Sequence, residues 1–185
     1  QIAASFGGFN RMNFSEDGYE VLPLIISPER KKQLNDNLLM FFTGFTRLSS
    51  EIQATNQIAA KEKNAQLKEM YQLVNEAEQV LVDASADIDE FGRMLDYTWK
   101  LKRQMGAKVS TDSIDLLYEK GMKAGASGGK LLGAGGGGFL VFYVKPEYRE
   151  NVKRAMAELL HVPFQFENGG TRVIHYTPEN YDPID

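Results

Sequence analysis

The sequence contains no cysteine, only two histidines and a single tryptophan. The lack of cysteine excludes a disulfide framework and, with only His161 and His175 as imidazoles, a zinc cluster. Any metal would need oxygen ligands. A basic surplus is also missing, because 21 lysines and arginines stand against 25 aspartates and glutamates, for a net charge of -4. This balance argues against nucleic acid as a partner.

Long apolar runs are absent too, so the sequence predicts no transmembrane helix and no membrane partner. The first ten residues lack a basic start followed by an apolar block, which argues against a signal peptide. Together with the absence of cysteine, this favours a cytoplasmic location. A length of 185 residues is enough for one domain with a core, or for one domain plus a piece of another.

Turn residues and apolar periodicity predict alternating strands and helices. Strands are expected where short apolar runs end at turn residues: 9–14 and 19–26 as a hairpin, 38–43, 139–144, and a final pair at 164–166 and 172–176. Helices are expected from Pro28, through much of 49–91, from a capping box at 87–90 to about 105, over 112–123 after Ser110 or Thr111, and from Pro146 to near 160. This order predicts an α+β fold.

Glycine is concentrated between Gly128 and Phe139, where the chain reads GGKLLGAGGGGF ahead of an apolar strand. A bare backbone suits a positive φ or the close approach of a ligand, and phosphate is the ligand that fits it best. The run formally matches a dinucleotide fingerprint, but strand formers follow it where a helix is required. A Walker loop also fails, because Leu131 follows Lys130. A purely structural hairpin is the alternative.

The glycine run resembles the third conserved motif of the GHMP kinases, the superfamily of galactokinase, homoserine kinase, mevalonate kinase and phosphomevalonate kinase. Within it, the sequence is most similar to the bacterial D-glycero-D-manno-heptose 7-phosphate kinases. Further matching segments, in the same order, lie at 1–10, 42–47, 91–95 with Trp99 and Lys102, and 123–126. The resemblance therefore spans almost the whole chain.

The resemblance implies a ferredoxin-like GHMP kinase C-terminal domain at 27–185, an antiparallel sheet covered by helices with several added helices. Residues 1–26 would be the end of the N-terminal kinase domain. The family transfers phosphate from ATP, with Mg²⁺, to a sugar-phosphate substrate, here at the anomeric hydroxyl of D-glycero-D-manno-heptose 7-phosphate. Its Gly-Ser-Ser type ATP loop is not found in the sequence, and its catalytic aspartate would stand directly before Gln1. We therefore expect no catalytic residue here, an inactive isolated chain, and the N-terminal domain as a partner that mainly holds ATP and Mg²⁺.

The resemblance also assigns binding roles. The expected ATP-phosphate loop consists of Gly133, Ala134, Gly135, Gly136, Gly137 and Gly138. The expected substrate-binding residues are Gly7, Gly8, Arg47 and Lys130. Arg47 either binds the sugar's phosphate through its guanidinium or is a surface arginine, and Lys130 is either a phosphate ligand or a strand lysine with its head in water. Lys102 is expected to be solvated, and no metal ligand is predicted.

Two other functions remain open at this point. A galactokinase- or fucokinase-like enzyme would use the same superfamily fold on an unphosphorylated sugar. A non-catalytic ligand-binding or regulatory module would use a ferredoxin-like arrangement to sense a small molecule without phosphoryl transfer.

Overall fold

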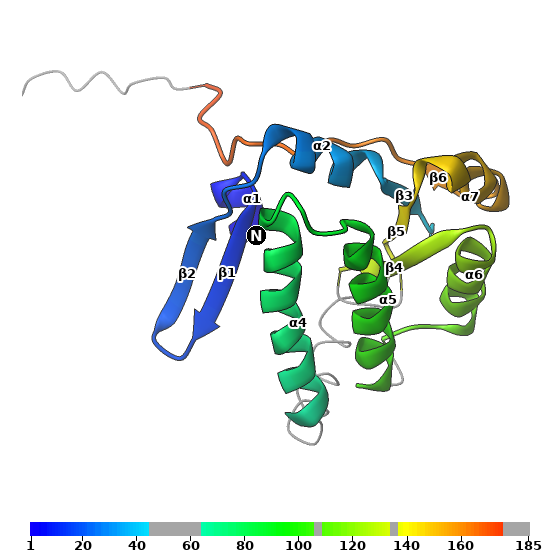
Figure 1. Ribbon diagram of the computed structural model, residues 1–185, viewed down its shortest axis with the longest axis horizontal. Coiled ribbons are helices and arrows are strands. Elements are labelled where there is room, and N and C mark those ends of the chain that lie inside the picture. Colours follow the sequence, from blue (N-terminus) through cyan, green and yellow to red (C-terminus); the bar gives the residue numbers. More distant parts are fainter. Residues whose placement is uncertain (45–63, 106–108, 134–136, 176–185) are drawn as a thin grey trace, which may run out of the picture. The chain divides into compact units, whose positions relative to one another are not determined.

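The computed structural model describes residues 1–44, 64–105, 109–133 and 137–175. The chain forms two compact units (Figure 1). One unit consists of Gln1–Leu24 with Gln165–Asp185, and the other of Ile25–Phe164. No helix in the described ranges is both long and apolar enough to cross a membrane.

The first unit contains the short helix α1 (Ile2–Phe6) and a hairpin of β1 (Asn10–Ser15) and β2 (Gly18–Pro23). The two strands pair antiparallel, from Asn10 opposite Pro23 to Ser15 opposite Gly18. This confirms the predicted hairpin. Phe14 and Tyr19 face each other across it with ring centroids 6.4 Å apart, and both are more than half exposed.

The end of the described chain packs beside α1 in the same unit, and the final strand pair predicted there is wrong. Within the described residues after His161 there is no strand. The backbone groups of this segment bond elsewhere: the Thr171 N–H donates to the Ser5 carbonyl at 2.9 Å, and the Glu167 carbonyl accepts from Gly8 N–H at 3.1 Å. Because these partners belong to the chain around α1, no strand ladder forms.

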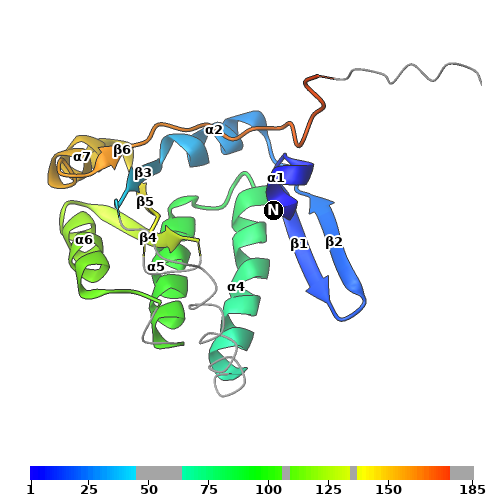
Figure 2. The same ribbon diagram turned by 180° about the vertical axis from the view of Figure 1, so that it is seen from behind.

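The second unit carries a four-stranded antiparallel sheet in the order β4-β5-β3-β6. Its helices cover this sheet, which Figures 1 and 2 show from front and back. The elements are α2 (Pro28–Asp36), β3 (Leu38–Phe42), α4 (Asn64–Val82), α5 (Asp89–Gln104), α6 (Asp112–Lys123), β4 (Ala126–Leu132), β5 (Phe139–Val144), η1 (Pro146–Tyr148), α7 (Arg149–Ala155) and β6 (Leu160–His161). The predicted α+β fold is confirmed.

Local capping signals in the sequence account for two helix starts. The Ser27 side chain accepts from the Arg30 N–H at 3.1 Å, with Pro28 in the first turn of α2. The Thr111 hydroxyl accepts from the Ile114 N–H at 3.3 Å at the start of α6. Both predicted helix starts are confirmed, since each hydroxyl satisfies one otherwise unpaired N–H of the first turn.

One predicted capping box and one predicted helix end are wrong, although α5 itself begins and ends where it was predicted. No capping box opens α5, because the Glu90 carboxylate pairs with Arg93 and does not reach back, while the Asp87 carboxylate accepts from the Asp89 N–H at 3.0 Å. Helix α7 ends at Ala155, not near 160. After a turn at 156–159, Leu160–His161 form β6, which pairs with the end of β3. The predicted helix therefore included a turn and the start of a short strand in addition to α7.

Aromatic side chains fill the core between the sheet and its helices. Phe142 of β5 lies 6.3 Å from Phe41 of β3 and 5.8 Å from Tyr118 of α6, measured between ring centroids. Tyr118 in turn lies 6.1 Å from Trp99 of α5. Phe142, Phe41 and Trp99 are almost fully buried. Helices α5 and α6 are thus anchored to the same two strands.

Helix α5 approaches β4 so closely that no side chain fits between them. A Cβ atom at Gly128 would overlap the carbonyl oxygen of Gly92 and lie 2.8 Å from the Asp96 nitrogen. Gly128 and Gly129 are both buried strand residues. The first glycines of the run therefore serve packing, and only those after Leu132 form a loop.

A buried polar chain of contacts ties α2, β5 and α5 together. The Asn37 amide donates to the Tyr143 hydroxyl at 2.7 Å, and that hydroxyl donates to Asp89 Oδ1 at 2.9 Å. The ammonium of Lys145 pairs with the other Asp89 oxygen. Burial alone would raise the pKa of Asp89, but the bonds from Lys145 and Tyr143 outweigh it and hold the pKa below its usual range.

This network predicts a pH-dependent contribution to stability. The Asp89 carboxylate stabilises the fold fully above its unfolded-state pKa of about 3.9, and this contribution disappears as pH falls through the lower folded-state pKa. We expect the free-energy difference between the wild type and Asp89→Asn, measured by urea unfolding, to be largest near neutral pH and to shrink below about pH 4. Parallel pH profiles of the two proteins would contradict the assignment.

Candidate functional site

The hairpin of β4 and β5 carries most of the predicted site. Lys130 pairs with Val141 in the ladder, and Leu132 with Phe139, so the glycine loop begins directly after Leu132. Gly133 has φ +100°, and a Cβ atom there would meet nothing within 4 Å. The backbone at the start of the loop thus faces open space, as a ligand-binding backbone must. Of the predicted loop and substrate residues, Ala134, Gly135, Gly136 and Arg47 lie outside the described residues.

The other end of the loop is held by Thr43, directly after β3. Its hydroxyl donates to the Gly138 carbonyl at 2.9 Å and accepts from the Gly138 N–H at 3.2 Å. Its own N–H donates to the same carbonyl at 2.9 Å. Thr43 is 6% exposed and Gly138 is partly buried, so these bonds are partly shielded from water. Sequence reasoning identified Thr43 only as the end of a strand.

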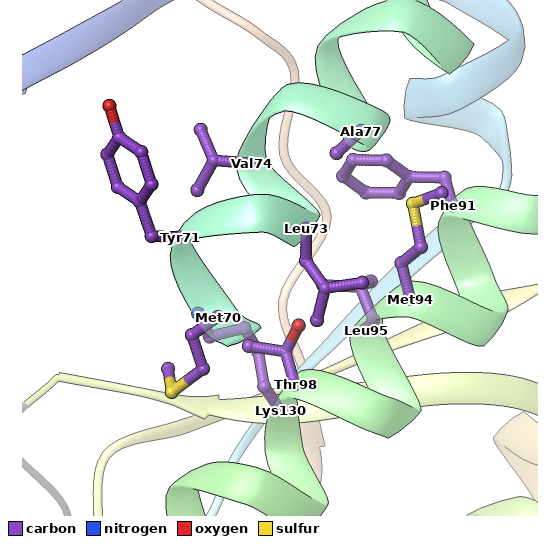
Figure 3. A pocket seen from close by; sticks show the side chains of 10 residues that line it. All are labelled: Met70, Tyr71, Leu73, Val74, Ala77, Phe91, Met94, Leu95, Thr98 and Lys130. Atoms are coloured by element: carbon purple, nitrogen blue, oxygen red, sulfur yellow. The ribbon is translucent and has the colours of Figure 1, made fainter. Parts of the chain in front are cut away.

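A cavity of about 400 Å³ opens between α4 and α5, next to β4. Figure 3 shows its lining side chains: Met70, Tyr71, Leu73, Val74, Ala77, Phe91, Met94, Leu95, Thr98 and Lys130. Lys130 is the one charged residue in this set. Its ammonium therefore lies beside an apolar wall, three residues before the loop, where it is poorly hydrated.

Lys130 and Lys102 form a pair of neighbouring cations. Burial lowers the pKa of Lys130, and burial together with the positive charge of Lys130 lowers the pKa of Lys102. Neither ammonium forms an ion pair with a carboxylate of the described residues. An anion bound here would relieve both the repulsion and the loss of hydration. The arrangement therefore suits a phosphate group.

Lys102 is a site candidate that sequence reasoning missed, since it was expected to be solvated and is half-buried. The available signal was its spacing. Lys102 lies one helical turn after Thr98, a cavity residue, so both occupy the same face of α5. Thr98 and Lys130 of β4 line the same cavity, so this face of α5 lies on the side of Lys130.

Gly7 and Gly8 belong to the other unit, and packing within that unit explains Gly7. It ends α1 with φ +63°, and a Cβ atom there would overlap the backbone of Gly169 and Gly170. Gly8 also has a positive φ, of +77°. The substrate-binding role predicted for both glycines stays a prediction.

The chemistry of the described residues fits phosphate and does not fit a metal. Backbone N–H groups and lysine ammoniums are donors, which match phosphate oxygens. Among the described residues, no three His, Cys, Asp or Glu side chains come together in a way that could hold a metal ion. The described residues of the site thus present donors that suit a phosphorylated molecule and offer no ligand set for Mg²⁺.

Comparison with known proteins gives consistent matches. Residues 67–162 match the family model described as GHMP kinases C terminal. The chain is 30% identical over 162 residues to D-glycero-alpha-D-manno-heptose 7-phosphate kinase of Campylobacter jejuni, covering 84% of this chain and 46% of that protein. It is 29% identical over 135 residues to the bifunctional fucokinase/GDP-fucose pyrophosphorylase of Arabidopsis thaliana, covering 68% of this chain and 12% of that protein.

Solved structures share the fold. A D-glycero-D-manno-heptose 1-phosphate kinase from Bacteroides thetaiotaomicron superposes with a TM-score of 0.66 at 26% identity, covering 92% of this chain and 46% of that one. Mevalonate kinase of L. major gives a TM-score of 0.65 at 19% identity, covering 85% and 47%. The chain thus spans less than half the length of these relatives.

Proposed function

This chain belongs to the GHMP kinases, and from that membership we propose that it is the C-terminal part of an ATP-dependent sugar kinase. The complete protein transfers a phosphoryl group to the anomeric hydroxyl of a sugar phosphate, D-glycero-D-manno-heptose 7-phosphate. The observation that carries this proposal is Lys130, which lines the cavity between α4 and α5 three residues before the start of the glycine loop at Gly133. The Campylobacter relative, named as a heptose 7-phosphate kinase, supports the choice of sugar.

The chain contributes positioning and charge neutralisation, which account for most of the catalysis of phosphoryl transfer. ATP, when bound, supplies the phosphoryl group. Backbone N–H groups of the glycine loop that begins at Gly133 bind phosphate oxygens, whereas the Gly138 N–H is already bonded to Thr43. Lys130 places its ammonium against the same negative charge. The base for the acceptor hydroxyl and the ligands of Mg²⁺ come from the rest of the kinase.

The rest of the kinase is also the proposed partner of the β1–β2 hairpin. Phe14 and Tyr19 lie opposite each other on this hairpin and are 68% and 56% exposed. Adjacent exposed aromatic side chains of this kind suit a surface that another part of the protein covers. We assign residues 1–26 to the end of the N-terminal kinase domain and 27–185 to the C-terminal domain. We also propose a cytoplasmic location, since the sugar kinase needs ATP.

A substrate panel with the complete kinase tests this function. We expect ADP release, followed by a coupled assay, with ATP, Mg²⁺ and D-glycero-D-manno-heptose 7-phosphate, and none from the isolated 185-residue chain. The panel includes the heptose 1-phosphate, because the Bacteroides relative is named for it, and also L-fucose and D-galactose. Activity confined to an unphosphorylated sugar would overturn the heptose assignment, and binding of a sugar without ADP release would favour a regulatory module.

The second candidate is a fucokinase-like activity. The similarity to the Arabidopsis bifunctional fucokinase extends over 68% of this chain and supports it. The two half-buried lysines favour the sugar phosphate, because a substrate with its own phosphate gives the second cation a partner in addition to ATP.

A further inference from the structure

We propose that Thr43 is a positioning residue for the glycine loop, whose C-terminal end it holds at Gly138 beside the first residue of β5. The inference rests on the proposed function only for the identity of the ligand. The anchoring itself is a property of the chain, so the anchoring and the proposed function can fail separately.

The contacts form a three-bond clamp between segments far apart in sequence. The Thr43 hydroxyl donates to the Gly138 carbonyl and accepts from the Gly138 N–H, at 2.9 and 3.2 Å, across 95 positions of sequence. The Thr43 N–H adds a bond of 2.9 Å to that carbonyl. These bonds continue the ladder of β3 and β5, which ends with Phe42 opposite Phe139. The clamp therefore adds one residue pair, Thr43 opposite Gly138, beyond the end of the β3–β5 ladder.

The side chain of Thr43 makes a hydrogen bond to the Gly138 N–H that the Thr43 backbone does not make. The Gly138 N–H donates to the Thr43 hydroxyl, and Gly138 has φ +110°, a conformation outside the strand region. At the other end of the loop, Gly133 follows Leu132, which pairs with Phe139 in the β4–β5 ladder. Both ends of the loop are therefore tied to β5 or its edge, and the Thr43 hydroxyl adds a side-chain anchor at the Gly138 end.

Burial makes the hydroxyl difficult to replace. Thr43 is 6% exposed and Gly138 is partly buried, so water would only partly replace the hydroxyl at the Gly138 N–H if it were removed. A partly buried donor that loses its acceptor costs free energy, and the loop end would move to find a new one. Glycines supply no side-chain contacts to oppose that movement.

Thr43→Val and Thr43→Ser separate hydrogen bonding from packing. Valine keeps the shape and loses the hydroxyl, whereas serine keeps the hydroxyl. In the complete kinase we expect Thr43→Val to lower kcat about tenfold with KM for the sugar changed less than about twofold, and Thr43→Ser to stay within about threefold of wild type. In the 185-residue chain, amide exchange at Gly138 should rise about tenfold in the valine variant.

Thr111→Val is the matched control, because it removes a threonine hydroxyl that caps α6 and touches no loop residue. It should lower stability without changing kcat or exchange at Gly138. If Thr43→Val does not fold, Thr43→Cys takes its place. Unchanged kcat and exchange in the valine variant, or a serine variant as impaired as valine, would overturn the clamp. A complete kinase that is inactive on every sugar would overturn the proposed function. Amide exchange at Gly138 would still test whether Thr43 anchors the loop.

Discussion

Gly128→Val is expected to prevent the unit formed by Ile25–Phe164 from folding. The new side chain would overlap the carbonyl oxygen of Gly92 and press on the Asp96 nitrogen, 2.8 Å from its Cβ. Both are backbone atoms of α5, so relief requires the whole helix to leave β4. We expect a loss of at least about 4 kcal/mol, comparable to the total stability of many domains.

Circular dichroism during heating would measure this effect. Gly133→Ala is the matched control, since its Cβ meets nothing within 4 Å and the strain comes from φ +100° alone. We expect that control to unfold cooperatively at a cost of about 1–2 kcal/mol. A valine variant at 128 whose melting temperature lies within a few degrees of wild type would show that α5 and β4 are less tightly packed than described.

Lys130→Met is expected to affect activity and stability in opposite directions. Loss of a charge-assisted contact to phosphate should lower kcat/KM of the complete kinase about 30-fold or more. Stability should stay the same or rise, because burial already disfavours the ammonium and lowers the pKa of Lys130. Methionine has a similar length and suits the apolar cavity between α4 and α5.

Steady-state kinetics and urea unfolding of the same preparations would measure both effects. Lys68→Met, at an exposed position on α4, is the control and should change neither quantity. A Lys130 variant with normal kcat/KM would exclude Lys130 from phosphate binding. One that loses activity and stability together would make it a structural lysine.

Local signals in the sequence predicted local structure well. Ser27 and Thr111 start helices with bonds to residues three positions away, and the glycine run ahead of a strand predicted a hairpin. These features depend on neighbours in sequence, so a pattern is enough to find them. The GHMP kinase resemblance rested on similar local motifs and is confirmed by the family match.

Features that depend on distant partners could not be predicted. The pattern of the glycine run does not distinguish Gly128 from Gly133. Gly128 is a strand residue on which α5 packs, whereas Gly133 is a loop residue. The role of Thr43 depends on Gly138, 95 positions away. The charge environment of Lys102 depends on Lys130 of another element. Composition and periodicity contain no information on which elements will meet.

The bond between Thr171 and Ser5 has a consequence for synthesis of the chain. Segments from near both ends of the sequence make up the first unit, whereas the second unit is continuous from Ile25 to Phe164. Ribosomes deliver a protein from its N-terminus, so the second unit can fold on the nascent chain before Glu167 and Thr171 have been made. Until then the Gly8 N–H and the Ser5 carbonyl lack these partners, and the first unit completes its hydrogen bonds only after the second unit has been synthesised.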